Sequence, residues 1–186
     1  LDTLFHTAPT IDNERAWDVT GLIGQYAHGN EPSHHIAYLY NFAGQPWKGQ
    51  EIVNQIKTTL YKSGRDGLCG NDDCGQMSAW YIFSSLGFYP VTPGMDYYVI
   101  GSPSVKSAKL HLPNGKEFDI KANYVSDKNI YIQSATLNGQ PYAKSFVKYK
   151  DLQKGGSLEF NMGEQAQKKW AVKMNERPLS KIMETN

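Results

Sequence analysis

The chain has 186 residues, which is enough for one well-packed core or for two small domains. Its 19 Lys and Arg residues nearly balance its 18 Asp and Glu residues, so electrostatic binding to nucleic acid or to an anionic membrane is not expected. No apolar run approaches the roughly 20 residues that a membrane-spanning helix needs, and we therefore expect no membrane span. Two cysteines, Cys69 and Cys74, are too few for a disulfide framework.

Apolar residues recur at helical spacing in the first half of the chain, where three helices are predicted. The first covers about residues 33–43, because Ser33 is a favourable N-cap and Gly44 a favourable terminator. Pro46 suits the first turn of the second helix, whose buried stripe consists of Ile52, Val53, Ile56 and Leu60. The third covers about residues 75–87, with a glycine at its C-terminal end. Short loops between such helices are typical of helical hairpins.

After Pro93 the pattern changes to short alternating runs separated by turn residues. Asn114-Gly115 between two of these runs is a strong hairpin signal. We therefore predict an α+β fold, with helical hairpins in residues 1–92 and a small antiparallel β domain in residues 93–186. The predicted strands are Tyr97–Ile100, Ala108–Leu112, Glu117–Ile120, Ile130–Leu137, Ser145–Tyr149 and Ser157–Phe160.

An acidic cluster, Asn71-Asp72-Asp73, lies between Gly70 and Gly75 just ahead of the third predicted helix. The helix dipole and the free N–H groups favour the ionised form of a carboxylate at a helix start. This form suits a general base or a metal ligand and does not suit a general acid. The simpler interpretation is that Asp73 is an ordinary N-cap, although two adjacent acids and an Asn exceed what one cap requires.

A second polar cluster, Gly29–His35, precedes the first predicted helix. Asn30 and Glu31 offer oxygen donors suited to a hard cation such as calcium. The simpler interpretation is a turn and a cap, with one histidine exposed and the other buried. A zinc site is disfavoured, because adjacent histidines on a helix point about 100° apart and Cys-x4-Cys is a loose spacing for zinc. Its ligands would be His34, His35, Cys69 and Cys74.

The two stretches that contain these clusters closely resemble signature sequences of glycoside hydrolase family 92. They are GLIGQYAHGNEPSHHIAYLYNFAG (Gly21–Gly44) and GLCGNDDCGQMSAWYIFSSLGFYPVTPG (Gly67–Gly94), and both have an unusual order of residues. The similarity continues through PSVKSAKLHLPNGKEFDI (Pro103–Ile120) and NIYIQSATLNG (Asn129–Gly139), so it extends over nearly the whole chain.

The resemblance implies a calcium-dependent exo-α-mannosidase that inverts the anomeric configuration, built from a β-sandwich domain and an (α/α)6-barrel catalytic domain. It implies that residues 1–92 are the C-terminal helices of this barrel. The implied substrates are terminal α-mannosides of N-glycans or mannans, with α-1,2 linkages favoured, and the implied location is periplasmic or extracellular. The implied residues are Asp73 as general base with Asp72 as the alternative, Asn71 and His34 at the substrate, and Glu31 and Asn30 at the metal.

Family members are several times this length and carry their general acid, a Glu, upstream of the matching region. The chain opens without a Met, and we interpret this as a start inside a larger protein. We therefore expect at most trace activity from the chain alone. We also expect it to self-associate through its helical half or to bind the missing remainder of the parent. The aromatic residues expected to lie exposed there are Tyr38, Tyr40, Phe42, Trp47, Trp80 and Tyr81.

Two other functions remain open from the sequence. The β half and the high aromatic content, 12% of the chain, also fit a non-catalytic carbohydrate-binding module, in which flat rings stack on sugars. A purely structural domain would contain only caps and turns at the two polar clusters. An active site requires Asp73 and Glu31 to face one concave surface, whereas a buried cap or a flat aromatic strip would favour these alternatives.

Overall fold

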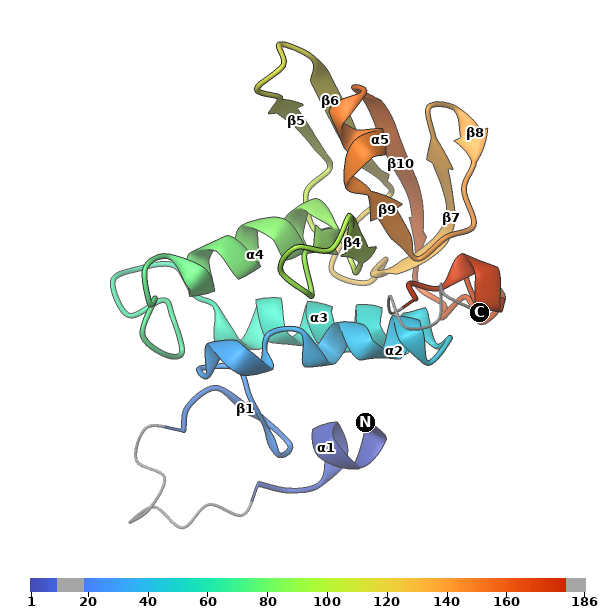
Figure 1. Ribbon diagram of the computed structural model, residues 1–186. Helices are drawn as coiled ribbons and strands as arrows, with labels where there is room; N and C mark the ends of the chain where they lie inside the picture. The colour runs from blue at the N-terminus through green and yellow to red at the C-terminus, as the bar shows by residue number, and fades with distance from the viewer. Residues whose placement is uncertain (10–18, 180–186) are drawn as a thin grey trace.

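The computed structural model describes residues 1–9 and 19–179, and its two halves form two layers (Figure 1). The long helices α3 (Pro46–Leu60) and α4 (Gln76–Leu86) lie beneath the strands of the second half. Helix α1 (Asp2–His6) lies below α3, beside a small hairpin of β1 (Leu22–Ile23) and β2 (Tyr26–Ala27) that the sequence analysis did not predict. No helix in the described ranges is long and apolar enough to cross a membrane.

Both long helices begin and end close to their predicted positions. Pro46 occupies the first turn of α3, and the buried stripe of this helix includes Ile52, Val53 and Ile56. Helix α4 follows Gly75 and ends at Gly87, and both glycines have left-handed backbone angles, with φ of 91° and 101°. A residue with a Cβ is strained in this conformation, so the two glycines define the ends of α4.

The continuous helix predicted over residues 33–43 is wrong. This segment forms two 3₁₀ turns, η1 (Glu31–Ser33) and η2 (Ile36–Tyr38), followed by the short helix α2 (Leu39–Phe42). The backbone hydrogen bonds of this segment span three residues, as from the Tyr38 N–H to the His35 carbonyl oxygen at 3.0 Å, whereas the His34 carbonyl oxygen, which an α-helix would pair with Tyr38, accepts from the Trp80 ring N–H at 3.1 Å. The buried side chains of the segment are His34, Ala37, Tyr38, Tyr40 and Asn41.

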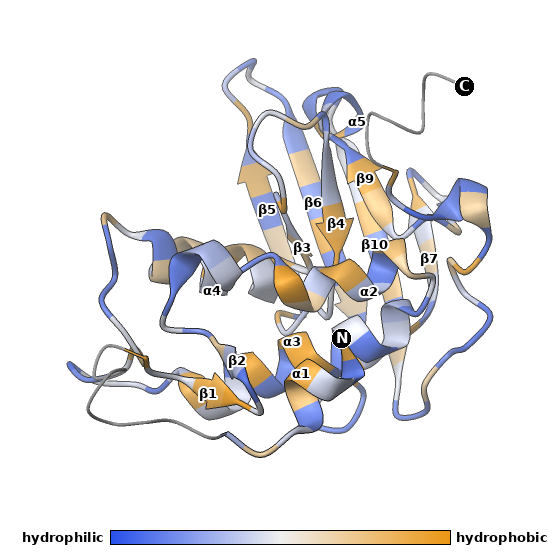
Figure 2. Cartoon of the chain, turned by 60° about the horizontal axis from the view of Figure 1, so that its bottom comes forward, coloured by the Kyte–Doolittle hydropathy of each residue, from blue (hydrophilic) through white to orange (hydrophobic). Residues whose placement is uncertain are grey.

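The second half contains two sheets. One has the strand order β5-β6-β10-β7-β8 and the other the order β3-β4-β9. Figure 2 shows apolar and polar residues alternating along β6, whose Phe118, Ile120 and Ala122 point into the core. The elements are β3 (Phe88–Tyr89), β4 (Tyr97–Ile100), β5 (Ser107–His111), β6 (Glu117–Asn123), β7 (Tyr131–Leu137), β8 (Gln140–Pro141), β9 (Phe146–Lys148), α5 (Tyr149–Gln153), β10 (Gly156–Gly163) and η3 (Met174–Glu176).

The six predicted strands are present, but the purely antiparallel arrangement needs one correction. Strands β6 and β10 pair in parallel, with Ile120 opposite Leu158, whereas the other strand pairs in the described chain are antiparallel. The long connection through β7, β8, β9 and α5 brings β10 back along β6 in the same direction. Parallel pairing needs a connection of this kind and cannot arise from a tight turn.

Buried polar side chains join the helical half to the β half. The Asn41 amide donates to the carbonyl oxygens of Ile100 and Ser145, at 2.7 Å and 3.2 Å. The side-chain oxygen of Gln50 on α3 accepts a hydrogen bond from the Ile132 N–H of β7, at 3.0 Å. One hydrophobic cluster also contains residues of both halves, from Ile56 of α3 to Val99 of β4. The proposed domain boundary between residues 92 and 93 stays a prediction, and it crosses a continuous core.

Lys57 of α3 is also buried at this junction. Its Nζ donates to the carbonyl oxygen of Ser102 and, at 3.4 Å, to that of Ser84. No carboxylate pairs with it within residues 1–9 and 19–179. Burial lowers the pKa of Lys57 from 10.5 to about 7, because the ammonium form loses its hydration.

We predict that the free energy of unfolding increases from about pH 7 to about pH 9.5, by up to ~1.4 kcal/mol per pH unit. In this range the unfolded chain binds more protons at Lys57 than the folded chain does, so raising the pH favours folding. Above about pH 10 the trend reverses, because burial raises the pKa of Tyr38 and the unfolded chain loses that proton first. Urea titrations across this range measure the slope. The Lys57→Met variant should flatten it, and an unchanged slope would assign the effect to other groups.

The exposed aromatic surface predicted for the helical half is largely wrong. Tyr38, Tyr40 and Trp80 are at most 2% exposed, and Phe42 and Trp47 are partly buried. Their partners are the strands of the β half and the residues before η1, which close most of this core without further elements. Exposed apolar side chains on α4 are limited to Tyr81, which is 40% exposed, and its neighbour Ile82, which is 58% exposed.

Candidate active site

The two polar clusters of the sequence meet at two glycines. A Cβ built on Gly70 would lie 2.9 Å from the Cα of Gly29, and one built on Gly29 would lie 3.2 Å from the carbonyl oxygen of Cys69. Neither distance leaves room for a side chain. The loop that carries Glu31 and the loop that carries Asp73 are therefore in backbone contact, which the sequence could not show.

The turn that leads into α4 has an unusual backbone. Asp73, Cys74 and Gly75 follow one another with φ of 40°, 60° and 91°, all in the left-handed region. For residues with a Cβ this conformation costs roughly 1–2 kcal/mol each, although Asp tolerates it better than most. Strained residues of this kind persist only where surrounding contacts hold them, and they cluster at functional sites.

Asp72 provides one of these contacts. Its Oδ1 accepts a hydrogen bond from the Ser78 N–H at 2.8 Å, and its Oδ2 accepts one from the Ser78 hydroxyl at 2.9 Å. Ser78 is the third residue of α4, so Asp72 satisfies a free N–H at the helix start as an N-cap side chain would. The capping interpretation considered for Asp73 therefore applies to Asp72.

Asp73 itself is exposed, as is Asn71 before it. Within the described residues the Asp73 carboxylate has no hydrogen-bond or ion-pair partner. An exposed carboxylate in a fixed turn at a helix start can accept a proton from a water molecule or bind a ligand. The geometry thus separates the two acids, with Asp72 as the anchor and Asp73 as the reactive candidate.

Glu31 lines a cavity of about 380 Å³ next to the contact between the two loops. Gln76, the first residue of α4, and Tyr89 of β3 lie in the same wall, whereas Asp73 is not among the residues that line this cavity. Glu31 is partly buried and Asn30 is exposed. The residues lining the cavity are Glu31, Pro32, His34, His35, Gln76, Tyr89, Pro90, Val91 and Pro93.

The described residues do not form a metal site by themselves. No group of three or more His, Cys, Asp or Glu side chains among them could hold a metal ion, so the disfavoured zinc combination does not form. The oxygen donors of Asn30 and Glu31 suit calcium chemically. Calcium, however, takes about 6–8 oxygen ligands, more than these two residues can provide. Backbone oxygens, water and residues outside this chain would have to complete the set.

His34 is predicted to contact substrate, but its ring is 1% exposed. Its Nε2 donates to the carbonyl oxygen of His28 at 3.0 Å, so Nδ1 of the neutral ring accepts from the Gln76 amide at 3.2 Å. Burial lowers the pKa of His34, in agreement with a neutral ring. Both ring nitrogens have partners in the described chain, so His34 also supports the site, and its contact with substrate stays a prediction.

A second buried histidine, His28, stacks on His34 with ring centroids 4.5 Å apart. The Tyr61 hydroxyl donates its proton to the Met77 carbonyl oxygen, so it accepts from Nε2 of His28 at 2.7 Å. The Tyr26 hydroxyl, at 2.8 Å, then donates to Nδ1. Burial, with a smaller effect of His34, lowers the pKa of His28 to about 3, so the pair stays neutral near pH 7.

Sequence reasoning missed His28, Gln76 and Tyr61. His28 and Gln76 lie within the two stretches that resemble the family, next to residues that were assigned a role. That proximity was the only available signal, because their hydrogen bonds join segments that are far apart in the chain. Nothing in the sequence marks Tyr61, which lies in the loop after α3.

The chain matches the model of the Glycosyl hydrolase family 92 catalytic domain over residues 1–164. It is also 32% identical, over 155 residues, to a protein of Arthroderma benhamiae named an uncharacterized secreted glycosidase; the match covers 82% of this chain and 20% of that protein. These matches identify the class as a family of glycosyl hydrolases. The chain belongs to glycosyl hydrolase family 92, as the resemblance implied.

Solved structures agree with this assignment. The family GH92 α-mannosidase BT3965 from Bacteroides thetaiotaomicron, in complex with mannoimidazole, is 43% identical with a TM-score of 0.92; the match covers 97% of this chain and 24% of that one. The inverting mannosidase BT2199 from the same organism is 38% identical with a TM-score of 0.82; the match covers 96% and 25%. The chain therefore spans about a quarter of the length of these relatives.

Proposed function

We propose that the chain is the C-terminal part of a longer exo-α-mannosidase, which removes terminal α-mannosides from N-glycans or mannans with inversion of configuration. The observation that carries this proposal is the exposed Asp73 carboxylate in a left-handed turn that is tied to the Glu31 loop. Relatives named as an α-mannosidase and as an inverting mannosidase support the substrate and the stereochemistry. An α-1,2 linkage is the proposed preference.

Asp73 is the proposed general base. An inverting glycosidase needs a carboxylate that activates water and an acid that protonates the leaving oxygen, roughly 6.5–9.5 Å apart. Asp73 lies three residues before the start of α4 and is exposed, so a water molecule can reach its carboxylate. As the water oxygen forms a bond to the anomeric carbon, one of its protons moves to Asp73 and the glycosidic C–O bond breaks. The leaving oxygen takes its proton from the proposed acid, a Glu of the upstream portion. Asp72 is the alternative base, and Asn71 a proposed substrate contact.

Glu31 and Asn30 are the proposed calcium ligands of this chain. Their carboxylate and amide oxygens are hard donors, and Glu31 lines the cavity beside the Asp73 loop. Bound calcium would supply positive charge and fixed coordination for sugar hydroxyls. For the chain alone we expect weak calcium binding or none, because these two residues are a small part of the required ligand set.

The non-catalytic alternatives receive less support. A sugar-binding strip would expose several aromatic rings on one face. In the part of the chain that the structure describes, the exposed aromatic residues lie on separate elements, with Tyr81 on α4, Tyr124 after β6 and Tyr149 on α5. A purely structural role would not explain an exposed acid in a strained turn whose loop is in backbone contact with the Glu31 loop.

The location we propose is periplasmic or extracellular. The relative from Arthroderma benhamiae, whose name describes it as secreted, supports this proposal. The proposed partners are a mannose-containing glycan and the remainder of the parent protein.

The decisive experiment is an assay of the full-length protein that contains this chain. We expect it to release mannose from α-1,2-mannobiose, with the β-anomer as the first product in proton NMR spectra. The chain alone should release at most a trace. Initial release of the α-anomer would contradict inversion, and full activity of the chain alone would contradict the proposed upstream acid.

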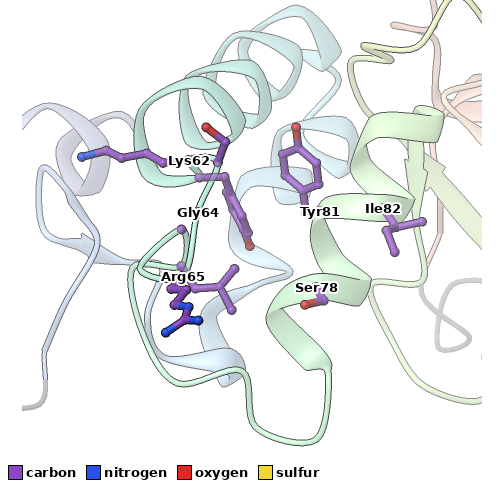
Figure 3. Close-up of a pocket in the computed structure, with 10 residues that line it drawn as sticks. Lys62, Gly64, Arg65, Ser78, Tyr81 and Ile82 are labelled. Atoms are coloured by element: carbon purple, nitrogen blue, oxygen red, sulfur yellow. The ribbon is translucent and has the colours of Figure 1, made fainter.

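The chain alone is also expected to associate through α4. Tyr81 and Ile82 line a cavity of about 550 Å³ between α4 and the loop of residues 61–68, and Ser78 in the same wall holds Asp72 (Figure 3). We predict a light-scattering mass above one chain, or tight binding of the upstream portion, and Ile82→Asp should abolish either. Met174→Asp is the matched control, since Met174 on η3 is similarly exposed, at 62%. A single-chain mass with no binding of the upstream portion would contradict this.

A further inference from the structure

The strained turn at residues 73–75 is held at both ends by side chains. At its N-terminal end the Asp72 carboxylate accepts two hydrogen bonds from Ser78. At its C-terminal end Gln76 donates one N–H to Nδ1 of His34, at 3.2 Å, and the other to the Tyr89 hydroxyl, at 2.9 Å. Asp73, which has no partner of its own in the described chain, lies between the two anchors.

The hydrogen bonds of Gln76 have a defined direction. A carbonyl oxygen can only accept, so the bond from His34 to the His28 carbonyl fixes the proton on Nε2 of a neutral His34 and leaves Nδ1 as an acceptor. The group facing Nδ1 must then be the amide nitrogen of Gln76. The backbone of His34 is also fixed, because the Trp80 ring N–H donates to its carbonyl oxygen at 3.1 Å. Gln76 is therefore tied to a rigid, buried partner.

We propose that Gln76 is a positioning residue, whose amide holds the Asp73 turn in register with the Glu31 loop. Its side chain makes a direct hydrogen bond from the first residue of α4, three positions after Asp73, to His34, the residue that follows η1 in the Glu31 loop. The catalytic consequence of this inference depends on the proposed function, whereas the structural part, the immobilisation of the turn, does not.

Loss of the Gln76 amide should let the turn relax. Two left-handed residues with side chains, Asp73 and Cys74, favour a different backbone once the anchor is gone. A shift of about 1 Å in a catalytic group can reduce the rate about 100-fold. Substrate binding depends less on this carboxylate, so the loss should appear in kcat and hardly in KM.

The kinetic test compares Gln76→Met with Gln50→Met in the full-length protein. Methionine has a similar length and no amide, and Gln50 is a buried glutamine of α3 that bonds to β7, away from the turn. We expect kcat for mannoside hydrolysis to fall about 10- to 100-fold in Gln76→Met, with KM nearly unchanged. Gln50→Met should keep the wild-type kcat at temperatures where it is folded. Tyr89→Phe removes one of the two hydrogen-bond acceptors of the Gln76 amide, so its kcat should lie between those of the two methionine variants.

A second test needs no activity and uses the 186-residue chain. Cys69 is a partly buried thiol in the same loop, and Cys74→Ser leaves it as the single thiol. We expect Gln76→Met to speed its reaction with a thiol reagent about tenfold or more, as loss of two hydrogen bonds implies, and Gln50→Met to leave the rate unchanged. An unchanged labelling rate in Gln76→Met would show that Gln76 does not immobilise the turn. A faster rate with unchanged kcat overturns the catalytic consequence. If the wild-type full-length protein hydrolyses no mannoside, the proposed function is wrong. The rates of Cys69 labelling then still test whether Gln76 immobilises the turn.

Discussion

Asp73→Asn in the full-length protein is expected to lower the turnover number by about 10²- to 10⁴-fold, the range that a general base contributes. The amide has the same shape as the carboxylate but cannot take a proton from the attacking water. Asn tolerates left-handed backbone angles as well as Asp does, so the turn with φ of 40° at this position should keep its fold. Initial rates on an aryl α-mannoside, together with thermal unfolding curves, separate the loss of chemistry from a loss of structure.

The control for this variant is Asp66→Asn, which makes the same change at an exposed acid in the preceding loop and should leave turnover unchanged.

Asp72→Ala is expected to affect stability. It removes both hydrogen bonds to Ser78, so we expect a loss of stability of about 1 kcal/mol, the usual effect of removing a helix cap. Near-normal turnover in Asp73→Asn would move the base to Asp72.

Chelation of calcium is expected to abolish the activity of the full-length protein, and added calcium should restore it. Glu31→Gln should increase the calcium concentration needed for half-maximal activity about 10- to 100-fold, since losing even a supporting group of a metal site has an effect of that size. The reason is that the amide keeps one oxygen donor but loses the negative charge that attracts a divalent cation.

The matched control is Glu164→Gln, because Glu164 is exposed beyond β10 and far in sequence from both polar clusters. It should leave the calcium dependence unchanged. If the protein hydrolyses mannosides at its full rate after complete removal of metal, the assignment of Glu31 and Asn30 to calcium is wrong.

Local sequence signals determined the two long helices and the six predicted strands, but not the β1–β2 hairpin. Helices α3 and α4 follow from Pro46, Gly75 and Gly87 and from apolar residues at helical spacing, and these signals act within a few turns of the chain. The strands follow in the same way from alternation and turn residues. The two polar clusters could also be found, since Gly, Asn and adjacent acids at helix starts are visible without any tertiary contact.

Tertiary structure alone decided how these pieces work together. The segment after Glu31 forms 3₁₀ turns, and the His34 carbonyl oxygen within it accepts a hydrogen bond from Trp80 of α4 instead of from the N–H of Tyr38. Strand β10 joins β6 in parallel because of a long return connection. The division of roles between Asp72 and Asp73 depends on which carboxylate reaches Ser78, a matter of turn geometry. The Gln76–His34 hydrogen bond joins residues 42 positions apart, so no local pattern encodes it. Such contacts arise only when the chain is packed, because their free energy depends on burial and on the partner that the fold brings into reach.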